Sequence, residues 1–457
     1  MTIHENTGDL LFAATLNEDY FCVTLSPEAL HRTLESDRAL RGLYRVVADE
    51  RPHLFAKTPY FVSRRQIERM AELIHAVESI VALPAYRERA LAWAPKIAQF
   101  DPGPLGVFFG YDFHLQGAYP QLIEINTNAG GALLNTTLAR AQACWQEVGG
   151  PPLPYDTIAL TEQNFVDMFR AEWRRQRGDA PLKSIAIVDV DPERQYLNLE
   201  FRLFERLFER NGIAAVVADP AEMELRGDGL WCRYLKIDLV YNRLTDFSLG
   251  EPSNAVLCEA YLSGRVVLTP HPRAHALYAD KHNLTLLTND ALLRSWGVPE
   301  STRAVLRSGV PRTVLVTSEN CETLWTERRR LFFKPSAGYG SKAAYRGDKL
   351  TRRVWHQMLA GQYVAQELVP PSQRRLQTDG EPVALKVDVR NYVYDGRVQL
   401  LAARMYQGQT TNFRTAGGGF AAVFVIDNAR SRVLECAAAY AQIQKWPHAL
   451  REFRELS

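Results

Sequence analysis

The chain has 457 residues, a formal net charge of +2 and 46% hydrophobic residues. These values are typical of a folded protein whose length allows two or three lobes, and they exclude the low hydrophobicity of a disordered chain. The near balance of opposite charges gives no support for a nucleic-acid partner.

The cysteines and the N-terminus indicate a cellular compartment. Six cysteines are scattered singly, without Cys-x-x-Cys pairs, which predicts reduced thiols rather than disulfides or a zinc site. The N-terminal MTIHENTGDLLF has no basic head before an apolar run, so we expect no signal peptide. No apolar stretch approaches the roughly 20 residues that cross a bilayer. We therefore expect a soluble, cytoplasmic protein without a membrane partner. The oligomeric state stays open, a homo-oligomer included.

The first 100 residues have a mostly helical pattern. Ser26-Pro27-Glu28 predicts a helix start, with serine as the cap and proline in the first turn. Ser63 to Val81 places apolar residues at helical spacing. We interpret this part as a packing layer.

Two short apolar segments follow. Val107 to Phe113 predicts one strand, and Leu122 to Asn126 predicts another that ends in Gly-rich sequence. A turn around Gln116–Tyr119 would fold the second strand back on the first.

The polar side chains of these strands predict a metal site. Because alternate side chains share a face of a strand, Ile123 and Ile125 are expected in a core, and Glu124 and Asn126 point the other way. The turn would bring Asp112 beside Glu124. Two carboxylates and an amide oxygen suit Mg²⁺, which substrate phosphates usually complete. The alternative is a solvated hairpin, but acids flanked by apolar residues need a partner.

A Gly-rich turn, Thr127-Asn128-Ala129-Gly130-Gly131, leads into a helical pattern from Ala132 to Val148. Such a turn offers backbone N–H groups to an anion. We therefore consider Asn128, Gly130 and Gly131 as candidates for binding a substrate carboxylate or acyl phosphate. An ordinary tight turn is the alternative.

The run at 149–154 is rich in Gly and Pro and predicts a linker. Beyond it, apolar strands such as Ile185–Val188, Ile213–Val217, Leu235–Tyr241 and Val266–Leu268 alternate with helical segments. This alternation predicts a parallel α/β sheet, in which ligands bind beyond the carboxyl ends of strands. Arg243 follows such an end and could hold a substrate carboxylate, although a surface salt bridge is an equal alternative. No Gly-x-Gly-x-x-Gly follows these strands, which argues against a dehydrogenase.

Two lysines precede features that suit phosphate. Lys281 opens a helical pattern that continues to about Trp296, and on composition alone it is an ordinary helix-start lysine. Lys334 ends an apolar strand and is followed by a loop of small residues, Pro335-Ser336-Ala337-Gly338-Tyr339-Gly340-Ser341. A compact positive charge beside a flexible backbone lets amides approach phosphate oxygens closely. The pattern is not a P-loop, because the lysine precedes the glycines. A plain β-turn is the alternative.

Asp395-Gly396 predicts a hairpin between Leu385–Tyr394 and Val398–Tyr406. A regular two-residue turn would place Arg390 and Arg404 on opposite faces, whereas a longer loop with a bulge would place them together. The sequence does not decide between these registers.

Asp112, a dozen further residues, then Glu124-x-Asn126 resembles the metal-binding signature of the ATP-grasp ligases. That signature normally ends the catalytic domain, but here it comes first. The chain is therefore similar to circularly permuted ATP-grasp proteins related to glutathionylspermidine synthases. The resemblance implies an α/β ATP-grasp core with a companion parallel α/β domain, divided as 1–150, 151–278 and 279–457.

The resemblance also implies roles for individual residues. It assigns Lys281, Lys334 and the loop with Ser336, Gly338, Gly340 and Ser341 to the ATP phosphates. It assigns Gln366, Glu367 and Val369 to the adenine hinge. Asp112, Glu124 and Asn126 would hold Mg²⁺, and the segment that normally precedes the signature supplies Arg390, Arg404, Asn412 and Arg414 as catalytic residues.

What the resemblance implies about activity is a carboxylate–amine ligase that uses ATP and Mg²⁺ and acts on small-molecule or peptide substrates through an acyl phosphate. An ATP-dependent phosphotransferase on the same fold and a non-catalytic nucleotide-binding protein are the alternatives.

Overall fold

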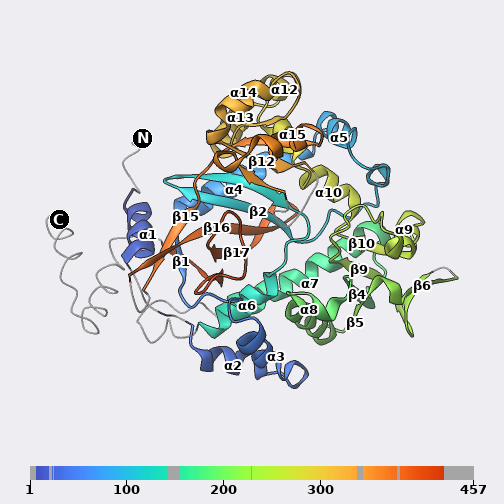
Figure 1. The fold of residues 1–457 in the computed structure, drawn as a ribbon. Coiled ribbons are helices and arrows are strands. Elements are labelled where there is room, and N and C mark those ends of the chain that lie inside the picture. Colours follow the sequence, from blue (N-terminus) through green and yellow to red (C-terminus); the bar gives the residue numbers. More distant parts are fainter. Residues whose placement is uncertain are drawn as a thin grey trace.

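The computed structural model describes residues 7–19, 23, 25–142, 155–227, 229–336, 343–377 and 381–426. Helices are mixed with parallel and antiparallel sheets, which confirms the α/β class. Figure 1 shows a central antiparallel sheet, a small lobe above it and a parallel sheet to its right. Gly338, Gly340 and Ser341 lie outside the described residues. None of the described helices is both long and apolar enough to span a membrane.

The central sheet joins strands from distant parts of the chain. Its order is β18-β17-β16-β2-β3, with β15 also paired to β16. The bounds are β2 Phe109–Gln116, β3 Tyr119–Asn126, β15 Ser372–Leu376, β16 Val383–Tyr394, β17 Arg397–Tyr406 and β18 Gly419–Ala421. All of these pairings are antiparallel, and β2 lies directly against β16. A second junction pairs β1 (Tyr60–Ser63) with β19 (Val423–Ile426) in parallel.

Two β-bulges set the register of this sheet. In β3 the pairing shifts by one residue, so that Asp112 lies opposite Glu124 while Phe113 lies opposite Leu122, and Ile123 is the extra residue. In β17 the shift falls between the partners of Tyr392 and Val393, after a two-residue turn. A bulge moves all later side chains to the other face. The expectation that Ile123 lies in the core with Ile125 is therefore wrong: Leu122 is buried, and Ile123 lines the cleft described below.

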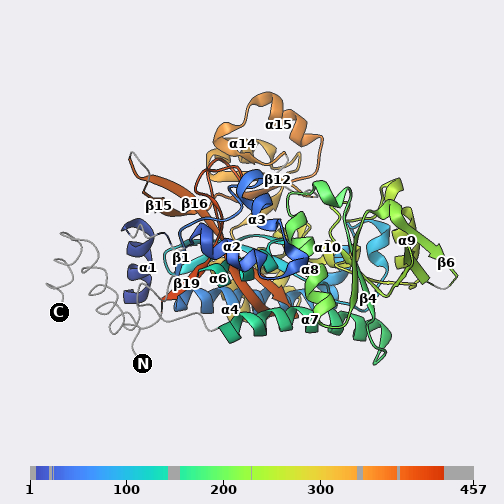
Figure 2. The same ribbon diagram turned by 90° about the horizontal axis from the view of Figure 1, so that it is seen from below.

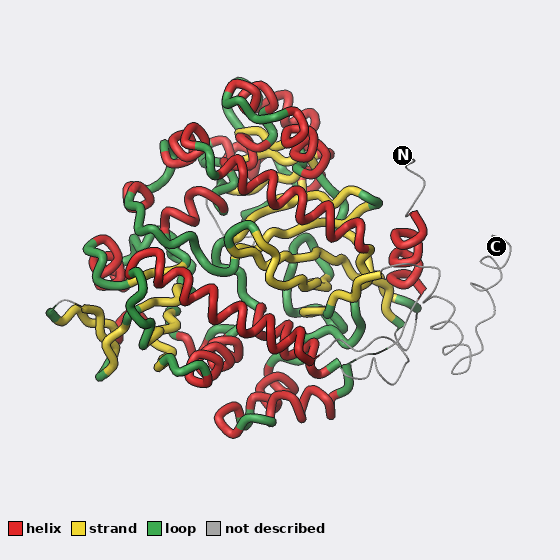
Figure 3. The backbone as a smooth tube through the Cα atoms, turned by 180° about the vertical axis from the view of Figure 1, so that it is seen from behind, coloured by secondary structure: helices red, strands yellow, loops and turns green. Residues whose placement is uncertain are grey.

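Helices cover the side of the central sheet opposite the small lobe (Figure 2). The N-terminal helices are α1 Thr7–Asp19, α2 Pro27–Glu35, α3 Leu43–Arg45, α4 Arg64–Val81 and α5 Pro84–Leu91. Ser26 caps α2, as the sequence predicts, and Ser63 caps α4 in a capping box with Gln66. The apolar side of α4 packs on the sheet, and the view from behind shows long helices crossing it (Figure 3).

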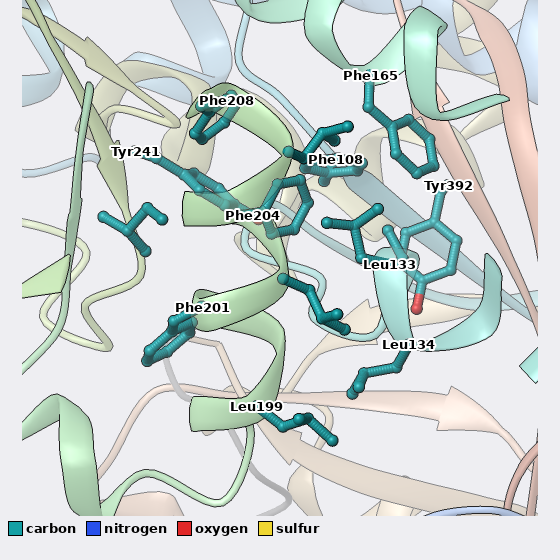
Figure 4. Packing of buried hydrophobic residues seen from close by; sticks show 14 of the residues in the cluster. Phe108, Leu133, Leu134, Phe165, Leu199, Phe201, Phe204, Phe208, Tyr241 and Tyr392 are labelled. Carbon is teal, nitrogen blue, oxygen red and sulfur yellow. The ribbon is translucent and has the colours of Figure 1, made fainter. Parts of the chain in front are cut away.

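A four-stranded parallel sheet has the order β10-β9-β4-β5. Its strands are β4 Ser184–Val188, β5 Ala214–Ala218, β9 Leu239–Asn242 and β10 Val267–Thr269, and the nearby helices are α6 Ala132–Ala141, α7 Tyr155–Arg177, α8 Asn198–Arg210 and α9 Ala255–Leu262. The expected strand Leu235–Tyr241 is divided, because β8 (Leu235–Ile237) belongs to a separate antiparallel sheet with β6 (Met223–Arg226) and β7 (Gly229–Cys232). An aromatic cluster around Phe108 and Phe204 packs α8 against Tyr392 of the central sheet (Figure 4).

The small lobe is built on the antiparallel sheet β11-β14-β12-β13. Its strands are β11 Thr313–Leu315, β12 Leu331–Pro335, β13 Tyr345–Arg346 and β14 Tyr363–Glu367, with helices α14 Cys321–Glu327 and α15 Arg352–Leu359. Before it come α10 Pro272–Tyr278, α11 His282–Leu287, α12 Asp290–Ser295 and α13 Glu300–Gly309. The single helix expected from Lys281 to Trp296 is broken, because the Asn289 side chain accepts from Leu292 N–H and starts α12.

Candidate active site

A cleft of about 570 Å³ lies between the small lobe and the central sheet. Seven of the described side chains that line it are cationic, and four are anionic. The cationic side chains are Lys281, Lys334, Arg346, Lys349, Lys386, Arg390 and Arg404, and the anionic ones are Asp112, Glu124, Glu367 and Asp388. The excess of positive charge suits a polyanionic ligand such as a nucleoside triphosphate.

The floor of the cleft holds a buried network of acids and arginines. Arg390 donates from Nε and Nη2 to the two carboxylate oxygens of Asp112, both at 2.6 Å. Arg404 donates to Asp112 Oδ2 at 2.8 Å and to Asp388 Oδ1 at 2.6 Å. Burial disfavours the charged form of Arg404, but Asp112 and Asp388 outweigh it and raise its pKa. Because Gly110 has no side chain, the guanidinium of Arg390 can pack over it.

The bulge in β17 places Arg404 on the face of Asp388 and Arg390, and the bulge in β3 places Glu124 on the face of Asp112. Asp388 lies opposite Arg404 and Asp112 lies opposite Arg390 in adjacent strand pairs. The question that the sequence leaves open for Arg390 and Arg404 is thus answered: they face the same side, after a two-residue turn followed by a bulge rather than after a longer loop.

Glu124 lies beside the floor network and stays ionised. Burial acts to raise its pKa, but the positive charges of Lys281 and Lys334 outweigh that effect and lower it to about 2. Asn126 links the two acids, since its amide nitrogen donates to Asp112 Oδ2 at 3.0 Å and to Glu124 Oε1 at 3.2 Å. The hairpin therefore brings the three predicted metal ligands together.

The three side chains fit a magnesium ion unequally. Among the described residues no group of three or more His, Cys, Asp or Glu is arranged to hold a metal, so a site here depends on Asn126 and on ligand oxygens. Oδ2 of Asp112 already accepts three hydrogen bonds, whereas Oδ1 accepts one. Glu124 carries a full charge and faces the cleft. The oxygen donors suit Mg²⁺, and Glu124 with Asn126 is better placed to hold it than Asp112.

The opposite wall carries Lys334, the penultimate residue of β12. Its Nζ donates to the Ile123 carbonyl and to Gln366 Oε1, both at 2.9 Å. Burial and then Lys281 lower its pKa, and Glu124 opposes them, with a resulting pKa of about 8. Lys281 also lines the cleft, and its backbone N–H donates to the Ser336 carbonyl at 3.0 Å.

In the segment that the resemblance assigns to the adenine hinge, several hydrogen-bonding groups already have partners within the protein. The N–H groups of Glu367 and Leu368 already donate to the Arg312 and Arg330 carbonyls. The Val369 carbonyl contacts Nδ1 of His114 at 2.9 Å, so this ring nitrogen must carry the proton. Gln366, Glu367 and Val369 all line the cleft, but the Gln366 side chain is directed to Lys334.

Three other predicted residues lie away from the cleft lining. Asn412 donates to the Gln407 and Thr410 carbonyls and accepts from Arg414 N–H, so it shapes the 407–415 loop. Arg414 is exposed and does not line the cleft. Ser336 is buried and donates to the Gln362 carbonyl at 3.1 Å. Asn412 and Ser336 thus already make hydrogen bonds within the protein, and the roles of all three residues toward ATP or the reacting group stay predictions.

The Gly-rich turn is filled by a side chain of the protein itself. Glu200 accepts from Gly131 N–H at 2.8 Å and from Leu133 N–H at 3.1 Å. These two N–H groups therefore already have a carboxylate partner within the protein, and a substrate role for Gly131 stays a prediction. Gly131 has φ +104°, and a Cβ there would lie 2.2 Å from the Phe420 ring. The backbone conformation and the close packing both therefore require glycine at this position.

Arg243 joins this buried network rather than the cleft. It donates to Asn128 Oδ1 at 2.7 Å and to the Tyr241 hydroxyl at 3.1 Å. The Gly130 carbonyl accepts from the Tyr392 hydroxyl at 2.7 Å. The surface salt bridge considered for Arg243 is excluded by its burial, and a substrate role for Asn128, Gly130 and Arg243 stays a prediction.

Sequence reasoning missed several lining residues. Asp388 lies two residues before Arg390 in one strand, so the two side chains share a face, and this spacing could have predicted that Asp388 lines the cleft. No sequence pattern could have predicted Thr411 or His114. Thr411 reaches Asp388 Oδ2 from a loop, and His114 contacts Val369, which is distant in the sequence.

Comparison of the sequence with protein-family models and with curated proteins yields no match. Solved structures do resemble the chain. A glutathione synthetase-like effector from Globodera pallida, in its apo form, has a TM-score of 0.53 at 10% identity, covering 81% of this chain and 90% of that chain. The ATP-grasp ligase PsnB with a minimal precursor has a TM-score of 0.31 at 18% identity, covering 56% and 82%. D-alanyl-alanine synthetase A from Vibrio cholerae has a TM-score of 0.31 at 12% identity, covering 57% and 80%.

The fold therefore resembles that of a glutathione synthetase-like protein over most of both chains.

Proposed function

We propose that the chain is an ATP-dependent carboxylate–amine ligase with an ATP-grasp core in circularly permuted order. The observation that carries the proposal is the placement of Glu124 opposite Lys334 and Lys281 in one cleft, with Arg390 and Arg404 on its floor. The pairing of β2 with β16 supports the permuted order, because it brings an early acidic hairpin to a late arginine strand.

The reaction would take place in two steps. A substrate carboxylate oxygen attacks the γ-phosphorus of ATP, the bond to the β-phosphate oxygen breaks, and ADP leaves. An amine nitrogen then attacks the acyl carbon, the C–O bond to phosphate breaks, and an amide, inorganic phosphate and a proton result. Neither step needs a side-chain nucleophile.

The residues of the cleft suit this chemistry. Lys281 and Lys334 would offset the charge of the phosphates, and Arg404 would stabilise charge at the transferred group. Asp112 and Asp388 hold Arg404 in place by hydrogen bonds on two sides. Glu124 and Asn126 would hold Mg²⁺, with Asp112 beside them, and the ion would supply charge neutralisation between the phosphates.

The similarity of the fold to a glutathione synthetase-like effector adds support for amide-forming chemistry. We infer that the partners are a small-molecule or peptide carboxylate and an amine.

The test is ADP release with mixtures of carboxylates and amines, followed by mass spectrometry for an amide. We expect release that depends on both substrates, or slow release with the carboxylate alone. A stable phosphorylated product that never reacts with amines would favour the phosphotransferase instead.

A further inference from the structure

Lys334 makes a contact with Gln366 that the proposed reaction does not by itself require. Both side chains are buried, with 5% and 2% of their surface exposed. The Lys334 ammonium group donates to Gln366 Oε1 and to the Ile123 carbonyl, both at 2.9 Å. An ammonium group has three donors, so these bonds leave one donor for the cleft that Lys334 lines.

A third residue fixes the orientation of the Gln366 amide. Thr313 Oγ1 donates its hydrogen to the Pro311 carbonyl at 2.9 Å. The same oxygen therefore accepts from Gln366 Nε2, 3.3 Å away. Because the nitrogen end of the amide must face Thr313, the oxygen end faces Lys334. A glutamate in this place would have no N–H for Thr313 and would hold the ammonium group as an ion pair.

The other partner of Lys334 depends on the bulge in β3. Ile123 is the extra residue there, and its carbonyl accepts from Lys334, which belongs to the small lobe. The hydrogen bonds thus run from Thr313 through Gln366 and Lys334 to the strand that carries Glu124. The position of the ammonium group is set from both walls of the cleft.

We propose that Gln366 is a positioning residue for Lys334: it holds the ammonium group toward the phosphates and does not read the nucleobase. The inference rests on the proposed function, since it takes Lys334 to contact phosphate. It replaces the place in the adenine hinge that the sequence resemblance implies for Gln366.

The experiment compares binding of ATP with Mg²⁺, of tripolyphosphate and of adenosine, the last by competition against ATP. Gln366→Leu should weaken ATP and tripolyphosphate about tenfold, because Lys334 loses a charge-assisted partner. Adenosine should bind as it does to the unaltered protein. Lys334→Met should show the same pattern, and the double variant should be no weaker than Lys334→Met, because the glutamine acts through the lysine.

Controls separate the outcomes. Gln163→Leu makes the same substitution in α7, outside the cleft, and should change nothing. If Gln366→Leu does not fold, Gln366→Met keeps the length of the side chain, removes the acceptor for Lys334 and should still weaken ATP more than adenosine. An equal loss of adenosine and ATP, or additive losses in the double variant, would overturn the positioning role. A wild-type protein that binds no nucleotide would instead overturn the proposed function, and this inference with it.

Discussion

Asp112 and Arg390 are 278 positions apart in the chain, yet they lie opposite each other in adjacent strands and share two hydrogen bonds of 2.6 Å. The contact joins β2, from the first third of the sequence, to β16, from the last. The floor of the cleft therefore exists only where these two parts of the chain meet.

The first prediction concerns this pair. Asp112→Ala should lower the free energy of unfolding by about 3–5 kcal/mol, because two buried guanidinium groups lose their carboxylate partner. Denaturant titration measures the loss. Asp49→Ala breaks the exposed pair with Arg45, whose side chains are 62% and 87% exposed, and should cost about 1 kcal/mol or less. Equal losses in the two variants would contradict the structural role of Asp112.

A second prediction concerns Glu124, which faces the cleft and not the core. Glu124→Gln should lower ATP-dependent product formation by roughly a hundredfold or more, because a charge that would hold Mg²⁺ is lost. Because the charge of Glu124 also offsets Lys281 and Lys334, thermal unfolding should shift to a lower temperature, and circular dichroism checks that the variant is folded in the assay. Glu68→Gln, at an exposed position of α4, is the matched control. Near-normal activity of Glu124→Gln at saturating Mg²⁺ would show that the metal assignment is wrong.

A third prediction concerns the register of β17, which can be tested by changing the number of residues in this strand. Inserting one alanine after Leu401 adds a residue between the bulge and Arg404. Arg404 would then lie opposite Val387 instead of Asp388 and point to the other face of the sheet, so we expect loss of ATP turnover. Gln399→Ala keeps the residue count and should keep activity. Turnover assays with circular dichroism separate loss of function from loss of folding. A fully active insertion variant would mean that the register does not determine the position of Arg404.

A pH-dependent prediction rests on His271, which is buried and 4% exposed. Its Nδ1 accepts from Ala274 N–H and its Nε2 faces the Pro104 carbonyl, so the ring is neutral. Burial lowers its pKa from 6.5 to about 4. Because the unfolded chain binds the proton more tightly, the stability from this group is present above pH 6.5 and falls as the pH drops toward 4, by about 3 kcal/mol.

His271→Asn keeps a residue that caps helices well but removes the titration. Between pH 7 and pH 4.5 the variant should therefore lose less free energy of unfolding than the unaltered protein does. Glu172, whose pKa burial raises, acts in the opposite direction in both proteins and cancels in the comparison. Identical pH profiles would contradict the lowered pKa of His271.

Local chemistry let the sequence predict much of the fold. The hairpin of β2 and β3 follows from alternation and from a turn at Gly117, and Asp395-Gly396 gives the turn between β16 and β17. Ser26 caps α2 because a serine before a helix accepts from the N–H three residues later. These interactions lie within a few residues of one another, so a single stretch of sequence contains both partners.

The sequence by itself therefore determined the acidic hairpin, the lysine strand and the α/β class of this protein. Only the tertiary structure decided that Ile123 is a bulge residue, that Glu200 occupies the turn at Gly131 and that Gln366 holds Lys334. The physical reason is that each of these outcomes depends on register between strands or on a hydrogen-bond partner from a distant segment. Alternation and turn chemistry carry no information about such partners.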